Sequence, residues 1–177
     1  MKKKTLALVL ALTLLVAGVV GGTLAWLTDQ TAEVKNTFTV GDINIGLTET
    51  TTDYKMVPGN TIAKDPTVTV KANSEACWLF VKVTESTDLK DFITYAIAEG
   101  WTALPGVDGV YYREVPASAA DQPFSVLAGD AVTVKSDVTR TMLETAKTDA
   151  PTLTFKAYAI QKDHFATADA AWAEVSK

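Results

Sequence analysis

The sequence predicts an all-β protein, an antiparallel β-sandwich with a few short connecting helices and a helix at its C-terminal end. Short segments in which apolar and polar residues alternate are the first observation, and the Gly- and Pro-containing turns that separate them are the second. Helical spacing of apolar residues occurs in only a few short stretches. We count about eight to ten short strands, which is typical of a sandwich.

The composition fits one folded domain that does not bind nucleic acid. Residues 26–177 are numerous enough for one domain with its own core, and no Pro-rich, Ser-rich or low-complexity stretch divides them. The sequence has 16 basic and 21 acidic side chains, a balance that repels phosphate backbones. Cys77 is the only cysteine, so no disulfide can form within the chain, and its apolar neighbours predict a buried thiol.

Residues 1–25 have the organisation of a secretory signal peptide. Three lysines form a basic start, and residues 5–20 form an apolar run shorter than the roughly 20 residues that cross a bilayer. Small residues precede the expected cut, and the residues of the predicted cleavage site are Thr23, Ala25 and Trp26. We therefore expect cleavage after Ala25 and a secreted protein, with a retained anchor as the alternative.

The segment that follows the predicted cut, residues 26–40, has the alternation of an extended strand. Its apolar side chains fall on even positions from Ala32 to Val40, with the polar Asn36 as an interruption. The residues predicted to make contacts when this segment pairs with another sheet are Trp26, Leu27, Ala32, Val34, Phe38 and Val40. After Gly41-Asp42 the apolar residues move to odd positions, Ile43, Ile45 and Leu47, which predicts a bulge or kink between two strands.

The middle of the chain alternates turns and strands. Val57-Pro58-Gly59-Asn60 has Pro and Gly at the central positions of a type II turn. A strand region then begins with Ile62, Val68 and Val70. Residues 76–83 are almost continuously apolar and aromatic, which is typical of a central strand covered on both faces. Asp88 is predicted to cap a short helical turn through Asp91 and Phe92.

The second half of the chain predicts further short strands and two helices. Strands are expected over residues 93–98, 101–104, 110–115, 124–127 and 132–134, with a hairpin through residues 105–109. Asp137 is expected to cap a helix over residues 138–146. A strand over residues 153–160 places Leu153, Phe155, Ala157 and Ala159 on one face. The spacing of Ala168, Ala171, Trp172 and Val175 predicts a closing helix.

Several of these motifs resemble proteins exported through the SipW-type signal peptidase, which include the TasA and camelysin biofilm-matrix proteins. The matching residues are Gly21-Gly22-Thr23 before the cut, Trp26 and Asp29 after it, Asn36-Thr37-Phe38 with Gly41-Asp42, Val57-Pro58-Gly59-Asn60-Thr61, and residues 153–161 with the helix around Trp172. The resemblance covers most of the chain. It implies a jelly-roll type of sandwich, a SipW-type export route and a Gram-positive source.

Camelysin-type proteins are classed as metallopeptidases, but this sequence lacks the residues of a zinc peptidase. His164 is the only histidine and no HExxH motif occurs, whereas a catalytic zinc usually takes about three protein ligands, most often with two or more histidines. No Gly-x-Ser-x-Gly motif is present, and Cys77 lies in an apolar segment. We therefore predict that the chain is not an enzyme and carries no metal or other cofactor.

Two groups of residues leave other functions open. Acid pairs such as Asp29 with Glu33, or Glu85 with Asp88, have the oxygen ligands for calcium or glycoside chemistry, although scattered acids are typical of a solvated surface. Aromatic residues offer a sugar-stacking surface wherever they are exposed, although most lie at positions that predict core. They are Trp78, Trp101, Tyr111, Tyr112 and Trp172.

The sequence thus predicts a secreted structural protein of the extracellular matrix or cell surface. We expect residues 26–40 of one copy, freed by cleavage, to complete the sheet of another copy within residues 41–177. Such a head-to-tail contact does not close on itself, so it builds a fibre. The alternative is that this segment folds back as the first strand of its own domain. Alternative functions are carbohydrate binding and secreted proteolysis. The expected partners are further copies, the SipW-type peptidase, and other matrix proteins or glycans.

Overall fold

The computed structural model of the chain describes residues 42–51 and 54–177. These residues belong to one compact unit, Val40–Lys177. All strand pairs within them are antiparallel and the helices are short, which confirms the all-β prediction. The jelly-roll connectivity implied by the resemblance stays a prediction, as do the boundaries at residues 25 and 40.

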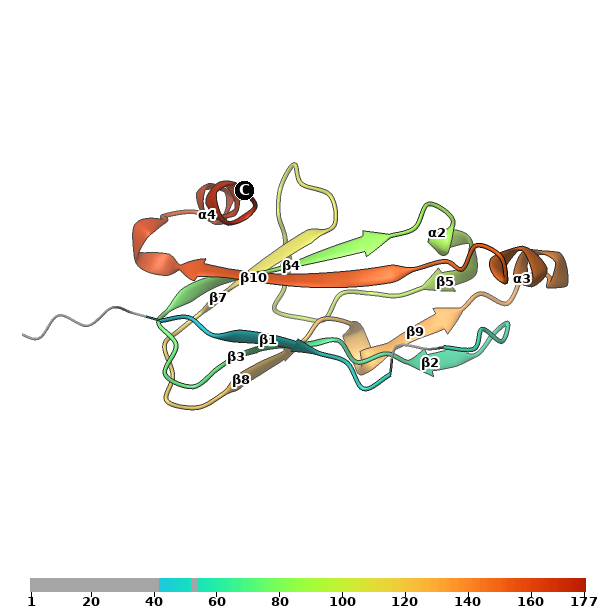
Figure 1. The fold of residues 1–177 in the computed structure, drawn as a ribbon, viewed down its shortest axis with the longest axis horizontal. Coiled ribbons are helices and arrows are strands. Elements are labelled where there is room, and N and C mark those ends of the chain that lie inside the picture. Colours follow the sequence, from blue (N-terminus) through green and yellow to red (C-terminus); the bar gives the residue numbers. More distant parts are fainter. Residues whose placement is uncertain (1–41, 52–53) are drawn as a thin grey trace, which may run out of the picture. The chain divides into compact units, whose positions relative to one another are not determined.

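The described strands form three sheets (Figure 1). The largest contains, in order, β10 (Leu153–Gln161), β4 (Cys77–Glu85), β7 (Val110–Val115) and β6 (Thr102–Ala103). The second contains β1 (Ile45–Thr48), β3 (Thr67–Val70) and β8 (Gln122–Ser125). The third contains β2 (Thr61–Ala63), β9 (Ala131–Val134) and β5 (Ile93–Thr94). β2 leads into β3 along the chain, and their respective partners, β9 and β8, are also consecutive. The two smaller sheets therefore follow one another in one layer.

β4 is the central strand of the fold and is covered on both faces, as its sequence predicted. Its odd-numbered residues, from Cys77 to Val83, pack against Val68 and Val70 of β3 and form the core between the layers. Its even-numbered Trp78 and Phe80 belong to a separate apolar cluster that includes helix α4 (Ala168–Val175). The alternation of side chains in a strand thus gives β4 two buried faces.

Two predicted turns are confirmed. Gly59 has φ of 79°, and Asn60 N–H donates to Val57 O at 3.0 Å, as a type II turn requires. The hairpin between β6 and β7 ends at Gly109, where φ is 70°. A Cβ atom at Gly109 would lie 2.4 Å from Val83 O, so this close approach to β4 requires glycine.

Helix α3 (Arg140–Ala146) begins later than predicted, and Asp137 does not cap it. Its N-cap is Thr139, which has extended backbone angles and accepts a hydrogen bond from Met142 N–H at 3.3 Å. Residues before Thr139 form a turn instead, since Val138 N–H donates to Lys135 O. The Thr139 hydroxyl, on an extended residue, therefore accepts from a free N–H group of the first helical turn, and Asp137 is not needed as a cap.

The other short helices lie in the connections. Helix α2 (Leu89–Phe92) follows Asp88 as predicted, but the Asp88 carboxylate accepts from Ser86 Oγ at 2.9 Å and caps no helix N–H. The 3-10 turns are η1 (Ala128–Asp130) and η2 (Lys162–His164). The strand predicted over residues 93–98 is wrong in length: it pairs only at β5 and through an isolated Ile97–Leu127 bridge.

Candidate functional site

Strand β10 is an edge strand, and its outer side has no strand partner among the residues that the structure describes. Its inner side pairs with β4 along its whole length of nine residues. Hydrogen bonds at the two ends show which residues of β10 bond to β4. Ser86 N–H donates to Thr152 O, and Lys162 N–H donates to Ala76 O, each at 2.9 Å. Hydrogen bonding alternates along an antiparallel pair, so the odd-numbered residues of β10 direct their N–H and C=O groups outward.

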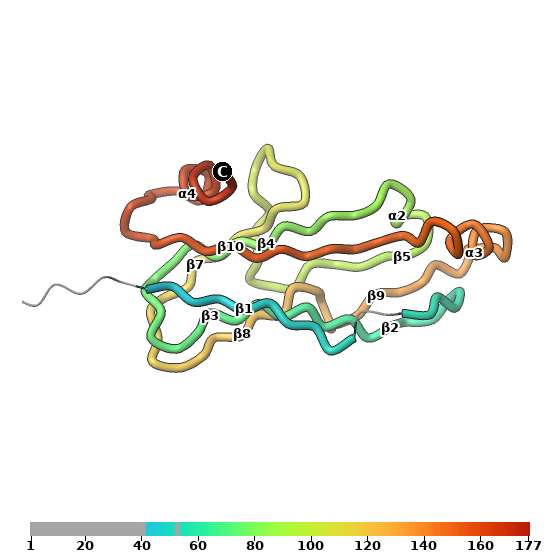
Figure 2. Tube along the Cα trace, viewed as in Figure 1, coloured from blue at the N-terminus to red at the C-terminus, as the bar shows by residue number. Residues whose placement is uncertain are grey.

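Strand β1 is the neighbouring edge of the other layer (Figures 1 and 2). Lys71 N–H donates to Asn44 O at 2.8 Å, so by the same alternation Ile45 and Leu47 direct their backbone groups away from β3. β1 and β10 form no strand pair with each other. Within the described ranges, two edges with unpaired backbone groups therefore lie next to one another.

A groove of about 390 Å³ opens between these two edges. Its lining residues are Leu47, Thr48, Glu49, Pro66, Leu153, Thr154 and Phe155. Leu47 is 38% exposed, although alternation places it on the same side of β1 as Ile45, which packs against the core. An apolar side chain on the core side of an edge strand is thus left uncovered. We call this feature the β1–β10 groove.

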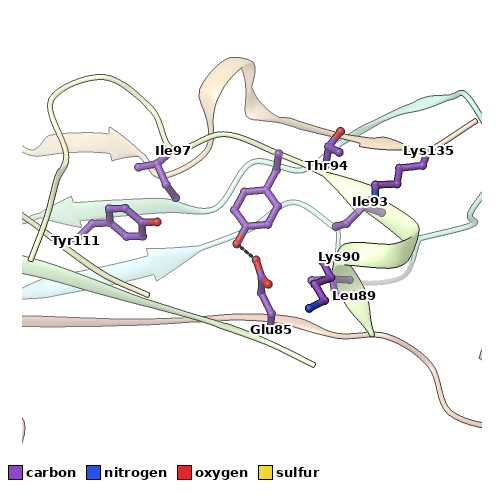
Figure 3. Close-up of a pocket in the computed structure, with 9 residues that line it drawn as sticks. Glu85, Leu89, Lys90, Ile93, Thr94, Ile97, Tyr111 and Lys135 are labelled. Atoms are coloured by element: carbon purple, nitrogen blue, oxygen red, sulfur yellow. Dashed lines mark hydrogen bonds between the residues drawn. The ribbon is translucent and has the colours of Figure 1, made fainter. Parts of the chain in front are cut away.

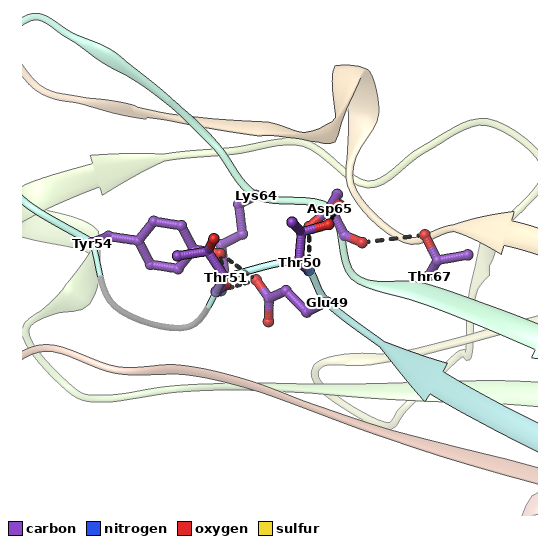
Figure 4. A network of polar contacts seen from close by, with 7 residues as sticks. All are labelled: Glu49, Thr50, Thr51, Tyr54, Lys64, Asp65 and Thr67. Atoms are coloured by element: carbon purple, nitrogen blue, oxygen red, sulfur yellow. Dashed lines mark hydrogen bonds and ion pairs between the residues drawn. The ribbon is translucent and has the colours of Figure 1, made fainter.

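A buried ion pair borders the β1–β10 groove (Figure 4). Lys64 Nζ lies 2.6 Å from Glu49 Oε1, and the two side chains are 9% and 17% exposed. The Tyr54 hydroxyl donates to the same carboxylate oxygen at 2.7 Å. Lys64 Nζ also lies 4.6 Å from the centre of the Tyr54 ring and 5.4 Å from that of Phe155. The pair therefore holds the segment after β1 against β10.

Two neighbouring groups have shifted pKa values. Burial, followed by the hydrogen bond to Glu49, raises the pKa of Tyr54, so its hydroxyl stays protonated and continues to donate. Hydrogen bonds from the Thr50 side chain and backbone lower the pKa of Asp65. Thr50 N–H donates to Asp65 Oδ1 at 2.9 Å, and the Thr50 hydroxyl donates to Asp65 Oδ2. Both contacts tie the end of β1 to the residues that precede β3.

The residues predicted for cleavage and strand donation lie outside the described residues. They are Thr23, Ala25, Trp26, Leu27, Ala32, Val34, Phe38 and Val40. Their roles stay predictions. What sequence reasoning missed is the acceptor side, because no motif marks an unpaired edge. The exposed apolar Leu47 was predicted only as a strand residue.

The aromatic residues considered for sugar stacking do not form one exposed surface. Trp101 is 9% exposed, and its indole N–H donates to Ser125 O at 2.9 Å. Trp78 is 5% exposed and packs edge-on against Tyr112. Trp172 lies against Phe80, with ring centres 5.3 Å apart. These rings mainly serve the two apolar clusters, as their strand and helix positions indicated.

The candidate catalytic and metal-binding residues are dispersed. His164 is exposed on η2, and burial raises the pKa of Cys77 to about 11, which keeps the thiol protonated. Glu85 accepts a hydrogen bond from the Tyr95 hydroxyl, whereas Asp88 is bonded to Ser86. Among the described residues, no group of three or more His, Cys, Asp or Glu side chains is placed to hold a metal ion.

Comparison with known proteins gives one family. Residues 1–88 match the family described as Camelysin metallo-endopeptidase. The first 88 residues of the chain are therefore similar to the camelysin family. This confirms the resemblance found in the sequence and supports a secreted protein of the matrix type, because members of the family are extracellular or surface proteins. No curated protein and no solved structure matches the chain.

The family description implies a metal ion, and the described part of this camelysin-like protein does not fit one. Its histidine lies on η2 at the C-terminal side of β10, beyond the residues that match the family. The acids nearest the β1–β10 groove, Glu49 and Asp65, are bonded to Lys64 and Thr50. These residues therefore support no metal-dependent step. No helix in the described ranges is long and apolar enough to span a membrane.

Proposed function

We propose that this camelysin-like protein is a structural component of the extracellular matrix or cell surface that assembles by strand donation. In this proposal the β1–β10 groove accepts residues 26–40 of another copy. Addition of a strand to the outer edge of β10 would satisfy its outward N–H and C=O groups. Among the described residues the outer edge of β10 has no strand partner and lies beside the exposed Leu47, and this observation carries the proposal.

The proposed donor matches the acceptor in length and pattern. Strand β10 has nine residues, and the alternating part of the donor, residues 32–40, has the same length. Its odd-numbered side chains are all polar: Glu33, Lys35, Thr37 and Thr39. In a strand added to β10 one set of alternate side chains faces the core and the other faces solvent. The even-numbered set would therefore cover the β1–β10 groove and the odd-numbered set would face water.

The same groove also suits closure within one chain. Only residues 41–44 lie between Val40 and Ile45, where β1 begins. Connections of this length join strands in hairpins. Either arrangement buries Leu47 and pairs the outer edge of β10. Only donation between copies leaves each molecule with one free donor and one free acceptor, and only that arrangement propagates.

Two forms of the chain test this proposal. The form that begins at Trp26 is expected to form filaments that are visible by electron microscopy and sediment rapidly. The form that begins at Gly41 lacks the donor and should stay monomeric at the same concentrations, with an unchanged β-sheet signal in circular dichroism. If the longer form stays monomeric across concentration and pH, donation between copies is wrong.

The other proposed partners follow from the export signal. We propose that a SipW-type signal peptidase cuts after Ala25, which N-terminal sequencing of the secreted protein would test. We also propose that the protein is not a peptidase. The dispersed positions of His164, Cys77 and the acids support this, and the purified protein should leave casein intact with or without added zinc. Chelator-sensitive cleavage of casein would instead favour the activity in the family description.

A further inference from the structure

A second cavity, of about 410 Å³, lies where β4 ends and α2 and β5 begin (Figure 3). Its polar lining residues are Glu85, Lys90, Thr94, Tyr95, Tyr111 and Lys135. A neighbouring cavity of about 370 Å³ shares Glu85, Tyr95 and Tyr111 and continues to Lys82, Asp108 and Gly109. We call the two together the tyrosine cleft. It shares no lining residue with the β1–β10 groove.

Two tyrosines and a carboxylate form the centre of the tyrosine cleft. The ring that donates its hydroxyl to Glu85 in Figure 3 is Tyr95. Burial, followed by this bond, raises the pKa of Tyr95, so the hydroxyl keeps its proton. Both Tyr95 and Tyr111 are half-buried, so parts of their rings stay accessible. Such rings offer a flat apolar face with a polar rim, which suits the face of a sugar ring.

Three lysines, Lys82, Lys90 and Lys135, line the cleft, and none makes an ion pair with a described residue. Lys90, on α2, and Lys135, after β9, make no ion pair with any described residue, unlike Lys64, Lys71, Lys147, Lys162 and Lys177. In Figure 3 both lie on the opposite side of Glu85 from Tyr111. The sequence has a net charge of −5. Ammonium groups that have no ionic partner among the described residues, gathered in one cleft of an acidic protein, point to an anionic ligand.

We propose that the tyrosine cleft binds an acidic oligosaccharide. Lys90 and Lys135 would bind a carboxylate of the ligand, and the Tyr95 and Tyr111 rings would contact its sugar faces. Glu85 accepts only one protein hydrogen bond among the described residues, so it can accept another from a sugar hydroxyl. The continuation of the cleft past Gly109 suits an extended chain of sugars. This function is independent of strand donation, and it uses none of the buried tryptophans.

Calorimetric titration of the full secreted protein tests the proposal. The probes are a hexasaccharide of galacturonate, a neutral hexasaccharide of glucose and a hexapeptide of glutamate. We expect the galacturonate probe to bind at least tenfold more tightly than the other two. Absence of galacturonate binding would overturn the proposal. Equal binding of the glucose probe would show that the lysines do not recognise a carboxylate of the ligand. Equal binding of the glutamate probe would show that the tyrosine rings do not recognise a sugar face.

Matched double variants place the binding. Lys90→Ala with Lys135→Ala should weaken galacturonate binding at least tenfold. Lys147→Ala with Lys177→Ala removes the same charge from exposed pairs elsewhere, with side chains that are each 70% exposed, and should leave binding unchanged. An equal loss of galacturonate binding in both double variants would show that the ligand is attracted by the overall charge of the protein. It would contradict binding in the tyrosine cleft. Filament formation should be unaffected in all of them, so this test is separate from that of assembly.

Discussion

Replacement of Leu47 by lysine is expected to suppress filament formation except at much higher protein concentration, while the monomer stays folded. Leu47 is 38% exposed in the β1–β10 groove, so a lysine there keeps its ammonium group in water until a strand is added. Strand addition would bury that charge without a partner, which is costly. The critical concentration for assembly, measured by sedimentation, should rise at least tenfold, which corresponds to about 1.4 kcal/mol.

Val57→Lys is the matched control, because Val57 is an exposed apolar residue outside the groove. It is 49% exposed and lies in the turn before β2. Both variants should unfold within about 0.5 kcal/mol of the original chain, as is usual for surface substitutions. Normal filaments from the Leu47→Lys variant, or an equal loss of assembly in the Val57→Lys variant, would show that the β1–β10 groove is not the acceptor site.

Lys64→Met is expected to give the largest loss of stability among the polar substitutions. It would leave the Glu49 carboxylate, whose side chain is only 17% exposed, without its cation. Removal of one partner of a buried pair costs about 3 kcal/mol or more in free energy of unfolding. For a domain of this size that lowers the melting temperature by roughly 6–12 °C. Thermal unfolding followed by circular dichroism measures it.

Two comparisons separate the buried pair from a general charge effect. Lys71→Met breaks the ion pair with Asp121, in which both side chains are 51% exposed, so its cost should be much smaller than that of Lys64→Met. Glu49→Gln combined with Lys64→Met removes both charges and should recover most of the stability that Lys64→Met loses. Equal losses from Lys64→Met and Lys71→Met would contradict the stabilising role of the buried pair.

The sequence was sufficient for the strands whose side chains alternate or are continuously apolar. The β4 segment predicted a strand with two covered faces, and the structure buries Leu79 and Phe80 on opposite sides of it. The type II turn was predictable because Pro58 and Gly59 restrict the backbone locally. In each case the signal lies in adjacent residues, so it needs no knowledge of the tertiary fold.

Features that depend on tertiary contacts were not predictable in the same way. Thr139, rather than Asp137, caps α3 because of its extended backbone, and both residue types are good caps. The β1–β10 groove depends on which strands become neighbours, although Leu47 and Leu153 are separated by most of the domain. The Lys64–Glu49 pair likewise joins residues of ordinary appearance that only the fold brings together.

Sedimentation of a mixture of two incomplete chains tests the central claim most directly. The chain that begins at Trp26 and carries Leu47→Lys has a donor segment but no working acceptor groove. The chain that begins at Gly41 has the acceptor groove but no donor segment. Each should sediment as a monomer alone. We predict that the mixture forms a complex of one copy of each and nothing larger. Two unchanged monomer peaks in the mixture would contradict donation of residues 26–40 into the β1–β10 groove.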